Sequence, residues 1–175
     1  PMQIIQSSFL GLILGLVILT STNTFGQWQQ INNGLTGKGL EVYTSLVVNT
    51  GILIGTEGGG VYFSSDGGNS WVAKNTGLST AAAKTISDMI LTKDSTIFVS
   101  TTAGVYKSTD RGDTWASSNT GMATLNTFKL AQVDSVIYVS TFGGGLHRSS
   151  DTGQSWQQLN VNNEAFIGDM TVLGK

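Results

Sequence analysis

The chain has 175 residues, of which 11% are charged and 23 are glycine, and it contains no cysteine. A formal net charge of -2 without a basic run offers no attraction for nucleic acid, and the lack of cysteine excludes disulfides, thiol catalysis and thiolate metal sites. Few charges together with many glycines are typical of short strands joined by tight turns.

The first 26 residues differ in character from the rest. Residues 9–19 form an apolar run that is shorter than the roughly 20 residues needed to span a bilayer, and polar residues 21–24 follow it. We therefore predict a signal peptide over residues 1–26, cleaved after Gly26, although no Lys or Arg precedes the run. The alternative is an uncleaved anchor or a buried helix. Export would make the rest of the chain secreted, periplasmic or cell-surface, with no stable membrane span after cleavage.

One eight-residue pattern, S-x-D-x-G-x-[ST]-W, occurs three times, and its tryptophans lie 44 and then 41 positions apart. The shared residues are Ser64, Asp66, Gly68, Ser70 and Trp71; Ser108, Asp110, Gly112, Thr114 and Trp115; and Ser149, Asp151, Gly153, Ser155 and Trp156. Trp28 precedes the first copy by a similar interval of 43 positions. A period of about 40 to 45 residues built from strands and glycine-rich turns is the signature of a propeller blade.

Alternating apolar residues predict four strands in each repeat. The first, inner strands are expected at 42–48, 85–91 and 128–133, the second at 52–56, 96–101 and 136–141, and the third at 61–64, 105–108 and 146–149. The fourth strand follows each tryptophan, and Trp28 begins another. The repeats thus cover about 41–79, 84–122 and 127–161, and the start of a further blade is predicted at 165–175. Residues 27–175 give about three and a half blades, whereas closed propellers need about 4 to 8, so we expect a partial propeller and a fragment of a longer chain.

Each position of the repeated turn suits a mechanical role. The aspartate is expected to accept backbone N–H groups, the glycine to adopt a left-handed conformation, and the Ser or Thr to add a hydroxyl. The tryptophan would bury on the order of 150 to 250 Å² between sheets. Catalytic or metal-binding aspartates are the alternative, but equivalent turns of successive blades lie too far apart to meet at one substrate.

The turn resembles the Asp-box, or bacterial neuraminidase repeat, of sialidases, xyloglucan-degrading glycoside hydrolases, sortilin-type receptors and photosystem assembly factors. The resemblance covers nearly all of the chain after Gly26. It implies an all-β propeller of four-stranded antiparallel blades, with the Asp-boxes on the rim opposite the ligand-binding face. It does not imply one activity, since these families use the same blades differently.

A sialidase-like site would require an arginine cluster, a tyrosine paired with a glutamate, and an acidic aspartate. The chain has two arginines, Arg111 and Arg148, and both belong to or adjoin repeated turns, so neither is expected to be a pocket residue. Glu57 precedes a glycine turn on the predicted ligand face and is a weak binding candidate. Its alternative interpretation is an exposed turn charge.

Two other ionisable positions are interpreted as structural. Asp88 and Asp169 occupy the same repeat position, which favours a shared structural role. His147 aligns with Tyr62 and Tyr106, which favours packing over catalysis. No catalytic, cofactor-binding or metal-binding residue is predicted.

These observations predict an exported, non-catalytic propeller that binds or displays a protein or glycan. Its ligand face would comprise loops 33–43, 75–88 and 119–126 with the glycine turns around Gly59, Gly104 and Gly144. The rival hypothesis is a fragment of a sialidase-like or xyloglucanase-like glycoside hydrolase whose catalytic residues lie outside this segment. An assembly factor is a third alternative, but it would require a basic patch that two arginines do not provide.

Overall fold

The computed structural model describes residues 30–159 and 167–170. The predicted signal peptide and the start of the outer strand predicted at Trp28 lie outside the described residues, as do residues 160–166 and 171–175, and no strand is assigned to residues 30–36. No strand is assigned to residues 167–170, within the further blade predicted from the sequence, and the rest of that predicted strand lies outside the described residues. In the described part of the chain, no helix is long and apolar enough to cross a membrane.

The described chain forms three four-stranded antiparallel sheets, each made of consecutive strands. A 3₁₀ helix, η1 (Gly37–Leu40), precedes the first sheet, which contains β1 (Val42–Val48), β2 (Gly51–Thr56), β3 (Gly60–Ser64) and β4 (Val72–Ala73). The second contains β5 (Ile86–Leu91), β6 (Ile97–Thr101), β7 (Gly104–Ser108) and β8 (Ala116–Ser117). The third contains β9 (Thr127–Val133), β10 (Val136–Thr141), β11 (Gly145–Ser149) and β12 (Gln157–Leu159).

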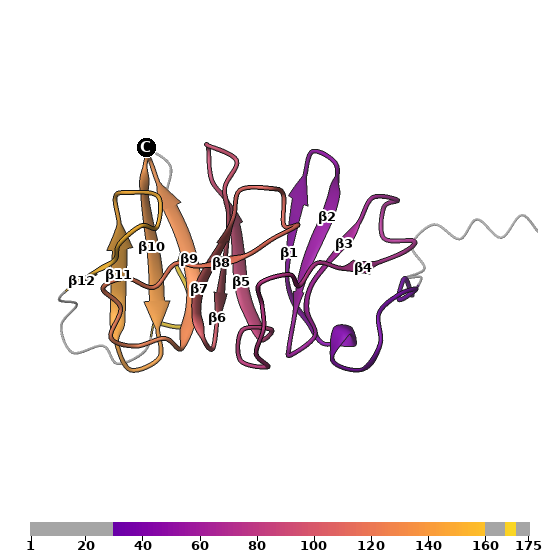
Figure 1. The fold of residues 1–175 in the computed structure, drawn as a ribbon, viewed down its shortest axis with the longest axis horizontal. Helices are drawn as coiled ribbons and strands as arrows, with labels where there is room; N and C mark the ends of the chain where they lie inside the picture. Colours follow the sequence, from indigo (N-terminus) through magenta and orange to yellow (C-terminus); the bar gives the residue numbers. More distant parts are fainter. Residues whose placement is uncertain (1–29, 160–166, 171–175) are drawn as a thin grey trace, which may run out of the picture. The chain divides into compact units, whose positions relative to one another are not determined.

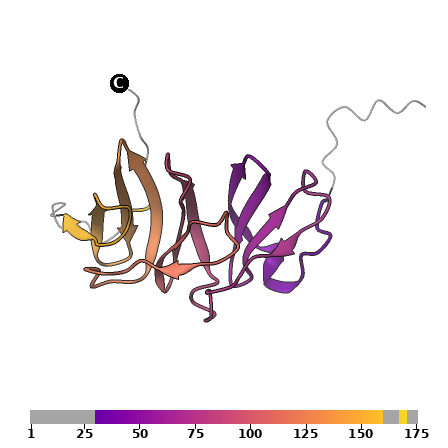
Figure 2. The same ribbon diagram turned by 45° about the horizontal axis from the view of Figure 1, so that its top comes forward.

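Each strand end that was predicted from the sequence for these three sheets lies within one residue of the observed end. The sheets lie side by side, and their first strands are neighbours, with β5 in contact with both β1 and β9 (Figure 1, Figure 2). The second strands are the most buried, and in β6 every residue is buried, as a strand covered on both faces requires. Antiparallel order places the β1–β2 turn and the repeated turn at one end of each sheet, and the β2–β3 turn at the other.

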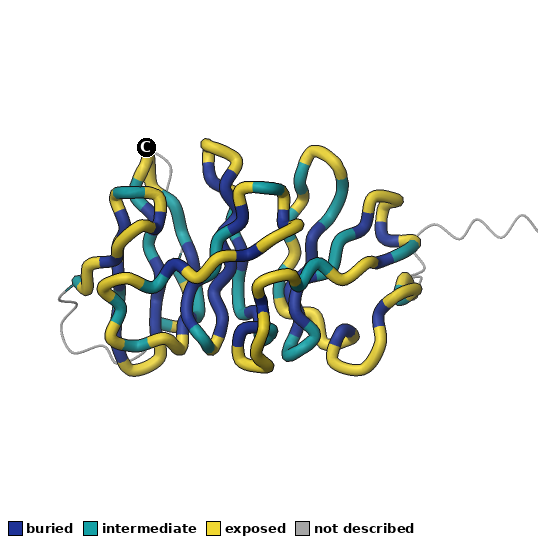
Figure 3. The backbone as a smooth tube through the Cα atoms, viewed as in Figure 1, coloured by how far each residue is buried: buried dark blue, intermediate teal, exposed yellow. Residues whose placement is uncertain are grey.

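The hydrophobic core lies between the sheets and not on one face of a single sheet. The cluster between the first and second sheets contains Leu53, Val61, Leu78, Ala83, Ile86, Met89, Ile97, Val99 and Trp115. The cluster between the second and third sheets contains Phe98, Val105, Leu130, Ile137, Val139 and Trp156. A smaller cluster of Leu35, Ile54 and Trp71 covers the other face of the first sheet. Figure 3 shows this distribution, with buried segments along the strands and exposed segments mostly at the turns.

Each tryptophan of a repeated turn hydrogen-bonds to the segment that follows the preceding tryptophan. Trp115 donates its main-chain N–H to the Thr76 carbonyl at 2.9 Å and its indole Nε1–H to the Lys74 carbonyl at 2.9 Å. The same pair of bonds joins Trp71 to Asn33 and Ile31, and Trp156 to Thr120 and Ser118. We call this arrangement the tryptophan contact.

A glycine completes each tryptophan contact. Gly77 has a φ of +97°, and a Cβ atom there would lie 2.0 Å from the Trp115 carbonyl oxygen. Gly34 and Gly121 lie equally close to Trp71 and Trp156. The Asn-x-Gly sequence that follows Trp28, Trp71 and Trp115 therefore recurs because the next sheet approaches its backbone too closely for a side chain.

Candidate functional site

The repeated turns are closed by their own side chains. In the first turn, Asp66 Oδ1 accepts the Ser70 main-chain N–H at 2.9 Å and the Ser64 hydroxyl at 2.7 Å, while Oδ2 accepts the Ser70 hydroxyl at 2.6 Å. Ser64 Oγ in turn accepts the Gly68 N–H at 2.8 Å. The same bonds link Ser108, Asp110, Gly112 and Thr114 in the second turn, and Ser149, Asp151, Gly153 and Ser155 in the third.

These hydrogen bonds keep the turn aspartates ionised. The Ser70 hydroxyl, followed by the Ser70 N–H and the Ser64 hydroxyl, lowers the pKa of Asp66 to about 2. The corresponding groups lower the pKa of Asp110 to about 2 and that of Asp151 further. Each carboxylate is thus held by donors of its own turn. This geometry favours the mechanical role predicted for the turn over catalysis.

Asp88 connects the first strands of three sheets. Its Oδ1 accepts the Thr44 hydroxyl at 3.3 Å and the Met89 N–H at 3.0 Å, and its Oδ2 accepts the Leu130 N–H at 3.1 Å. Asp169 makes the same local bond, to the Met170 N–H at 2.9 Å. Since its carboxylate is already engaged with β1, β5 and β9, Asp88 is a poor candidate for acid catalysis.

His147 is buried within the third sheet. It is 1% exposed and pairs across the strands with Val139, which belongs to the core between the second and third sheets. Burial lowers the pKa of His147. A neutral histidine in this core agrees with the packing role expected from its alignment with Tyr62 and Tyr106.

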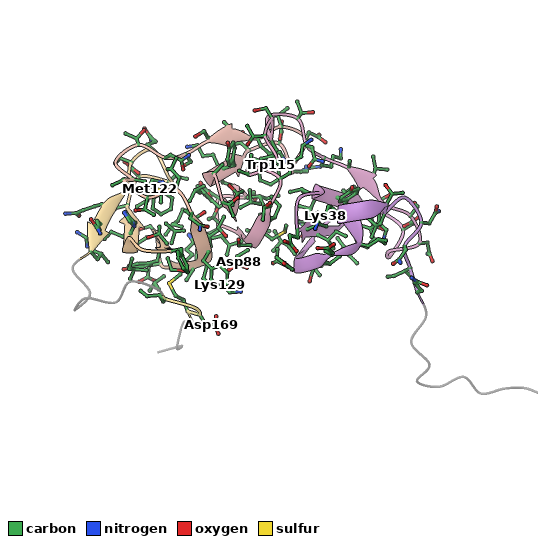
Figure 4. The ribbon with its side chains drawn as sticks, turned by 90° about the horizontal axis from the view of Figure 1, so that it is seen from below. Lys38, Asp88, Trp115, Met122, Lys129 and Asp169 are labelled. Carbon is green, nitrogen blue, oxygen red and sulfur yellow. The ribbon has the colours of Figure 1, made fainter. Side chains whose placement is uncertain are left out.

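Glu57 lies at the end opposite the repeated turns, in a small polar cluster that also contains Lys38, Glu41 and Tyr43. The Tyr43 hydroxyl donates to Glu57 Oε2 at 2.6 Å, and Lys38 Nζ lies 3.2 Å from Glu41 Oε2. The Glu57 N–H donates to the Glu41 carbonyl at 2.9 Å, which ties the β2–β3 turn to the segment before β1. We call these four residues the Tyr43–Glu57 cluster. Figure 4 views the molecule from this end, with Lys38 over the first sheet and Asp88 and Lys129 along the inner strands.

A β-bulge positions the tyrosine of this cluster. The register passes from Val42 opposite Thr56 to Thr44 opposite Gly55, so Tyr43 is the extra residue of the inner strand. Bulges redirect a side chain without breaking the sheet, and here Tyr43 reaches Glu57 while its own surface remains 57% exposed.

The electrostatics of the cluster favour binding over nucleophilic chemistry. The hydrogen bond from Tyr43, then Glu41 and the positive charge of Lys38, lower the pKa of Glu57. The same bond to Glu57 raises the pKa of Tyr43, so at neutral pH the phenol stays protonated beside an ionised carboxylate. An activated tyrosine nucleophile would need its pKa lowered instead. The cluster therefore presents one phenol, two carboxylates and one ammonium group as hydrogen-bonding groups for a ligand.

Sequence reasoning identified Glu57 but missed Tyr43, Lys38 and Glu41 as its neighbours. The hairpin itself contained the signal, because pairing the predicted strands 42–48 and 52–56 brings the start of one to the end of the other. The bulge that moves Tyr43 toward Glu57 has no sequence marker that we recognise. Within the described residues, no group of three or more His, Asp or Glu side chains gathers where it could hold a metal ion.

Comparisons with known proteins give a fold but not a family. No family model matches the sequence, and no curated protein matches it. The structure is similar to the extracellular domain of a putative one component system from B. thetaiotaomicron, with a TM-score of 0.61 and 18% identity over 79% of this chain and 19% of that chain. It is also similar to a GH74 enzyme from Niastella koreensis, with a TM-score of 0.54 and 22% identity over 75% of this chain and 24% of that one.

A third similar structure is YCF48 from Cyanidioschyzon merolae, with a TM-score of 0.51 and 17% identity over 68% of this chain and 37% of that chain. YCF48 also appears among the matches bound to D1 peptide. The chain therefore spans well under half the length of these proteins. At these identities the likeness shows the fold alone, and that fold is a β-propeller with four-stranded antiparallel blades.

Proposed function

We propose that this chain is an exported, non-catalytic binding or scaffold module whose ligand docks at the end that carries the Tyr43–Glu57 cluster. The observation that carries the proposal is that cluster itself, in which hydrogen-bonding side chains are partly exposed on a rigid hairpin. The opposite end holds the repeated turns, whose carboxylates are occupied within the turns. We interpret these turns as Asp-boxes that serve the scaffold.

Apolar groups at the same end extend the surface available to a ligand. Leu40 and Tyr43 flank the start of β1, and Leu125 and Phe142 occupy the equivalent region of the third sheet. All four are exposed, with Phe142 at 61%. A face that combines exposed aromatic rings with charged hydrogen-bonding groups suits a protein or glycan partner.

The matched structures support export and a ligand-binding role. Several of them are extracellular domains, and one shows YCF48 bound to D1 peptide. These are properties of those proteins. For this chain they support the predicted signal peptide and a protein or glycan ligand, but they do not identify the ligand.

The test is a screen of the purified chain against arrays of glycans and immobilised peptides, followed by titration calorimetry of the ligands found. Tyr43→Phe and Glu57→Gln each remove one hydrogen-bonding group of the cluster and should weaken binding about tenfold, since hydrogen bonds to charged groups contribute about 1.5 to 3 kcal/mol. Asp134→Asn removes a charge at the opposite end and should leave the affinity unchanged. A screen without ligands, or equal affinities for all three variants, would contradict the proposal.

The second candidate is a piece of a glycoside hydrolase, which the GH74 similarity favours. Glycoside hydrolysis needs two carboxyl groups on either side of the bond. Glu41 and Glu57 are the carboxylates of the cluster, and Glu57 already accepts a hydrogen bond from Tyr43. Since the catalytic residues of such an enzyme are expected outside this segment, release of reducing ends from xyloglucan by a longer protein that contains this chain would favour the enzyme over the binding module.

A further inference from the structure

A groove runs between the first and second sheets at the end that carries the repeated turns, opposite the Tyr43–Glu57 cluster. It consists of two adjoining cavities of about 180 and 260 Å³, which share Thr50 and Arg111 as lining residues. The first sheet contributes the β1–β2 turn and β3, and the second contributes the β5–β6 hairpin and its repeated turn. We call it the rim groove.

Arg111 is the distinctive charge of the rim groove. It occupies the fourth position of its repeated turn with a φ of +64°, and its side chain is exposed and lines both cavities. In the described part of the chain no carboxylate pairs with its guanidinium. The expectation that neither arginine is a pocket residue was therefore wrong for Arg111, because its backbone closes the turn while its side chain lies over the neighbouring sheet.

The other charges of the groove neutralise each other. Lys74 forms an ion pair with Asp113, and its ammonium group also lies 5.9 Å from the centre of the Phe63 ring. The groove thus presents one unpaired positive charge, and a guanidinium is suited to hold a carboxylate through two parallel hydrogen bonds.

The remaining lining combines neutral polar groups with apolar surface. The polar side chains are Asn49, Thr50, Ser65 and Ser95. The apolar ones include Val48, Leu91, Ile97 and Phe63. Neutral hydroxyl and amide groups beside an aromatic ring can serve the hydroxyls and the C–H face of a sugar ring.

The equivalent groove between the second and third sheets provides an internal comparison. Its cavity, of about 410 Å³, has Thr152 where the rim groove has Arg111, and its charged lining residues are Lys93, Asp94 and Asp134. Lys107, which aligns with Phe63, donates to the Thr152 carbonyl at 3.1 Å. The repeat therefore creates a groove at both junctions, but only the first one has an unpaired arginine and an aromatic ring.

We propose that the rim groove binds a uronic acid residue of an acidic glycan, with its carboxylate on Arg111, its hydroxyls on Thr50 and the neighbouring polar groups, and its ring against Phe63. One cation among neutral hydroxyls matches a sugar with a single carboxylate. A glutamate side chain would bring a carboxylate to Arg111 but no hydroxyls for the neutral polar groups of the groove. The proposal is independent of the ligand at the Tyr43–Glu57 cluster, because the two surfaces lie at opposite ends of the sheets.

The test is calorimetric titration of the purified chain with trigalacturonate, with neutral galactotriose of the same length, and with a tri-glutamate peptide. We expect trigalacturonate to bind, galactotriose to bind at least about tenfold more weakly, and added salt to lower the affinity. Preferential binding of tri-glutamate would overturn the proposal in favour of an acidic peptide, and equal binding of the two sugars would overturn the role of the carboxylate.

Three arginine variants assign the site. Arg111→Gly removes the guanidinium and places in the turn the residue that the first turn has at Gly67, so the fold should be retained and the affinity should fall at least about tenfold. Arg111→Lys keeps the charge without the two-bond geometry and should recover only part of the affinity. Arg148→Gln removes the same charge from β11, where Arg148 donates to Gln157 outside the groove, and should bind like the unmodified chain. An equal loss in Arg148→Gln would refute the site.

Arg111→Gly should weaken the binding of trigalacturonate without changing the affinity for the ligand of the Tyr43–Glu57 cluster. Tyr43→Phe should weaken the binding of that second ligand without changing the affinity for trigalacturonate. The two proposals therefore fail separately. Circular dichroism and the urea midpoint of each variant establish that a lost affinity does not reflect a lost fold.

Discussion

The junction between the first and second sheets and the junction between the second and third sheets share a hydrogen-bonding scheme but differ in what fills them. Trp115 and Trp156 donate equivalent main-chain and indole N–H groups across their junctions, with distances of 2.7 to 2.9 Å. Beneath those bonds, Leu53 of the first junction corresponds to Phe98 of the second, and Tyr106 corresponds to His147.

The tryptophan contact is thus the same at both junctions, while the side chains packed beneath it differ in size. The larger Phe98 ring fills its junction up to Gly153, where a Cβ atom would lie 2.5 Å from the ring. Gly112 has the same place beside the smaller Leu53, and a Cβ atom there would lie 3.5 Å away. The four predictions below test how far the two junctions are equivalent.

The largest effect is expected from removal of the tryptophans. Trp115→Ala and Trp156→Ala should each lower the free energy of unfolding by about 3 to 5 kcal/mol, because each loses a buried ring and leaves one carbonyl, that of Lys74 or Ser118, without its indole donor. Urea denaturation followed by circular dichroism measures both. Losses that differ by more than about 2 kcal/mol would show that the two contacts are not equivalent.

The next effect distinguishes the two turn glycines. Both have positive φ, so Gly→Ala costs about 1 kcal/mol in backbone conformation at either position. Gly153→Ala should cost a further 1 to 3 kcal/mol because the new methyl group overlaps Phe98, whereas Gly112→Ala has room beside Leu53. Equal urea midpoints for the two variants would contradict the difference in packing. Gly153→Ala combined with Phe98→Leu should recover part of the loss.

The pH dependence should single out the second junction. Burial lowers the folded-state pKa of His147 below its unfolded value of 6.5, so its neutral form stabilises the fold above pH 6.5 and stability is lost as the pH falls below that value. One proton limits the slope to about 1.4 kcal/mol per pH unit. The turn aspartates do not titrate in this window, since the pKa values of Asp66 and Asp110 are about 2.

His147→Phe provides the control for this prediction. Urea midpoints of the unmodified chain should fall between pH 7.5 and pH 5.5, and those of His147→Phe should stay nearly constant over the same interval. A slope that persists in the variant would assign the pH dependence to another group.

The smallest effect is expected at the fourth position of the turns. Arg111 and Thr152 have φ values of +64° and +55°, where the first turn has Gly67. Thr152→Gly should raise the free energy of unfolding by about 0.5 kcal/mol, because a β-branched residue is strained in this conformation, and Arg111→Gly should raise it by less. Differential scanning calorimetry can resolve both changes, and a loss of stability in Thr152→Gly would show that its side chain packs usefully.

The strands could be predicted from the sequence because three signals agreed. Apolar alternation, glycine turns and a threefold repeat each placed the strand ends, so the ends predicted for the first three strands of each sheet were within one residue of those observed. The tryptophan contact could not be predicted in the same way, because its acceptors are main-chain carbonyls, such as those of Lys74 and Ser118, that leave no mark in the side chains. Only Gly77 and its equivalents signalled it, and their role was not apparent until the sheets were seen together.

The candidate sites depended on local geometry that the sequence does not encode simply. Glu57 was found from its place before a glycine turn, but its partner Tyr43 depends on a bulge. Arg111 was assigned to the scaffold because of its position in the motif, whereas the left-handed backbone directs its side chain into the rim groove. The position of a residue in a structural repeat therefore predicts its backbone conformation. It does not predict whether an outward-facing side chain at that position binds a ligand.

The tryptophan contact also gives the array of sheets a direction. Each unit offers donors to the unit before it and carbonyl acceptors to the unit after it, so donors and acceptors occupy different surfaces and identical surfaces never meet. A substitution at one partner should consequently disturb only one of the two neighbouring sheets. A side chain introduced at Gly77 would disturb Trp115 of the following sheet and would not contact Trp71 of its own sheet. An exchange of whole periods, from one tryptophan to the next, would keep these bonds at every junction and change only the side chains packed beneath them.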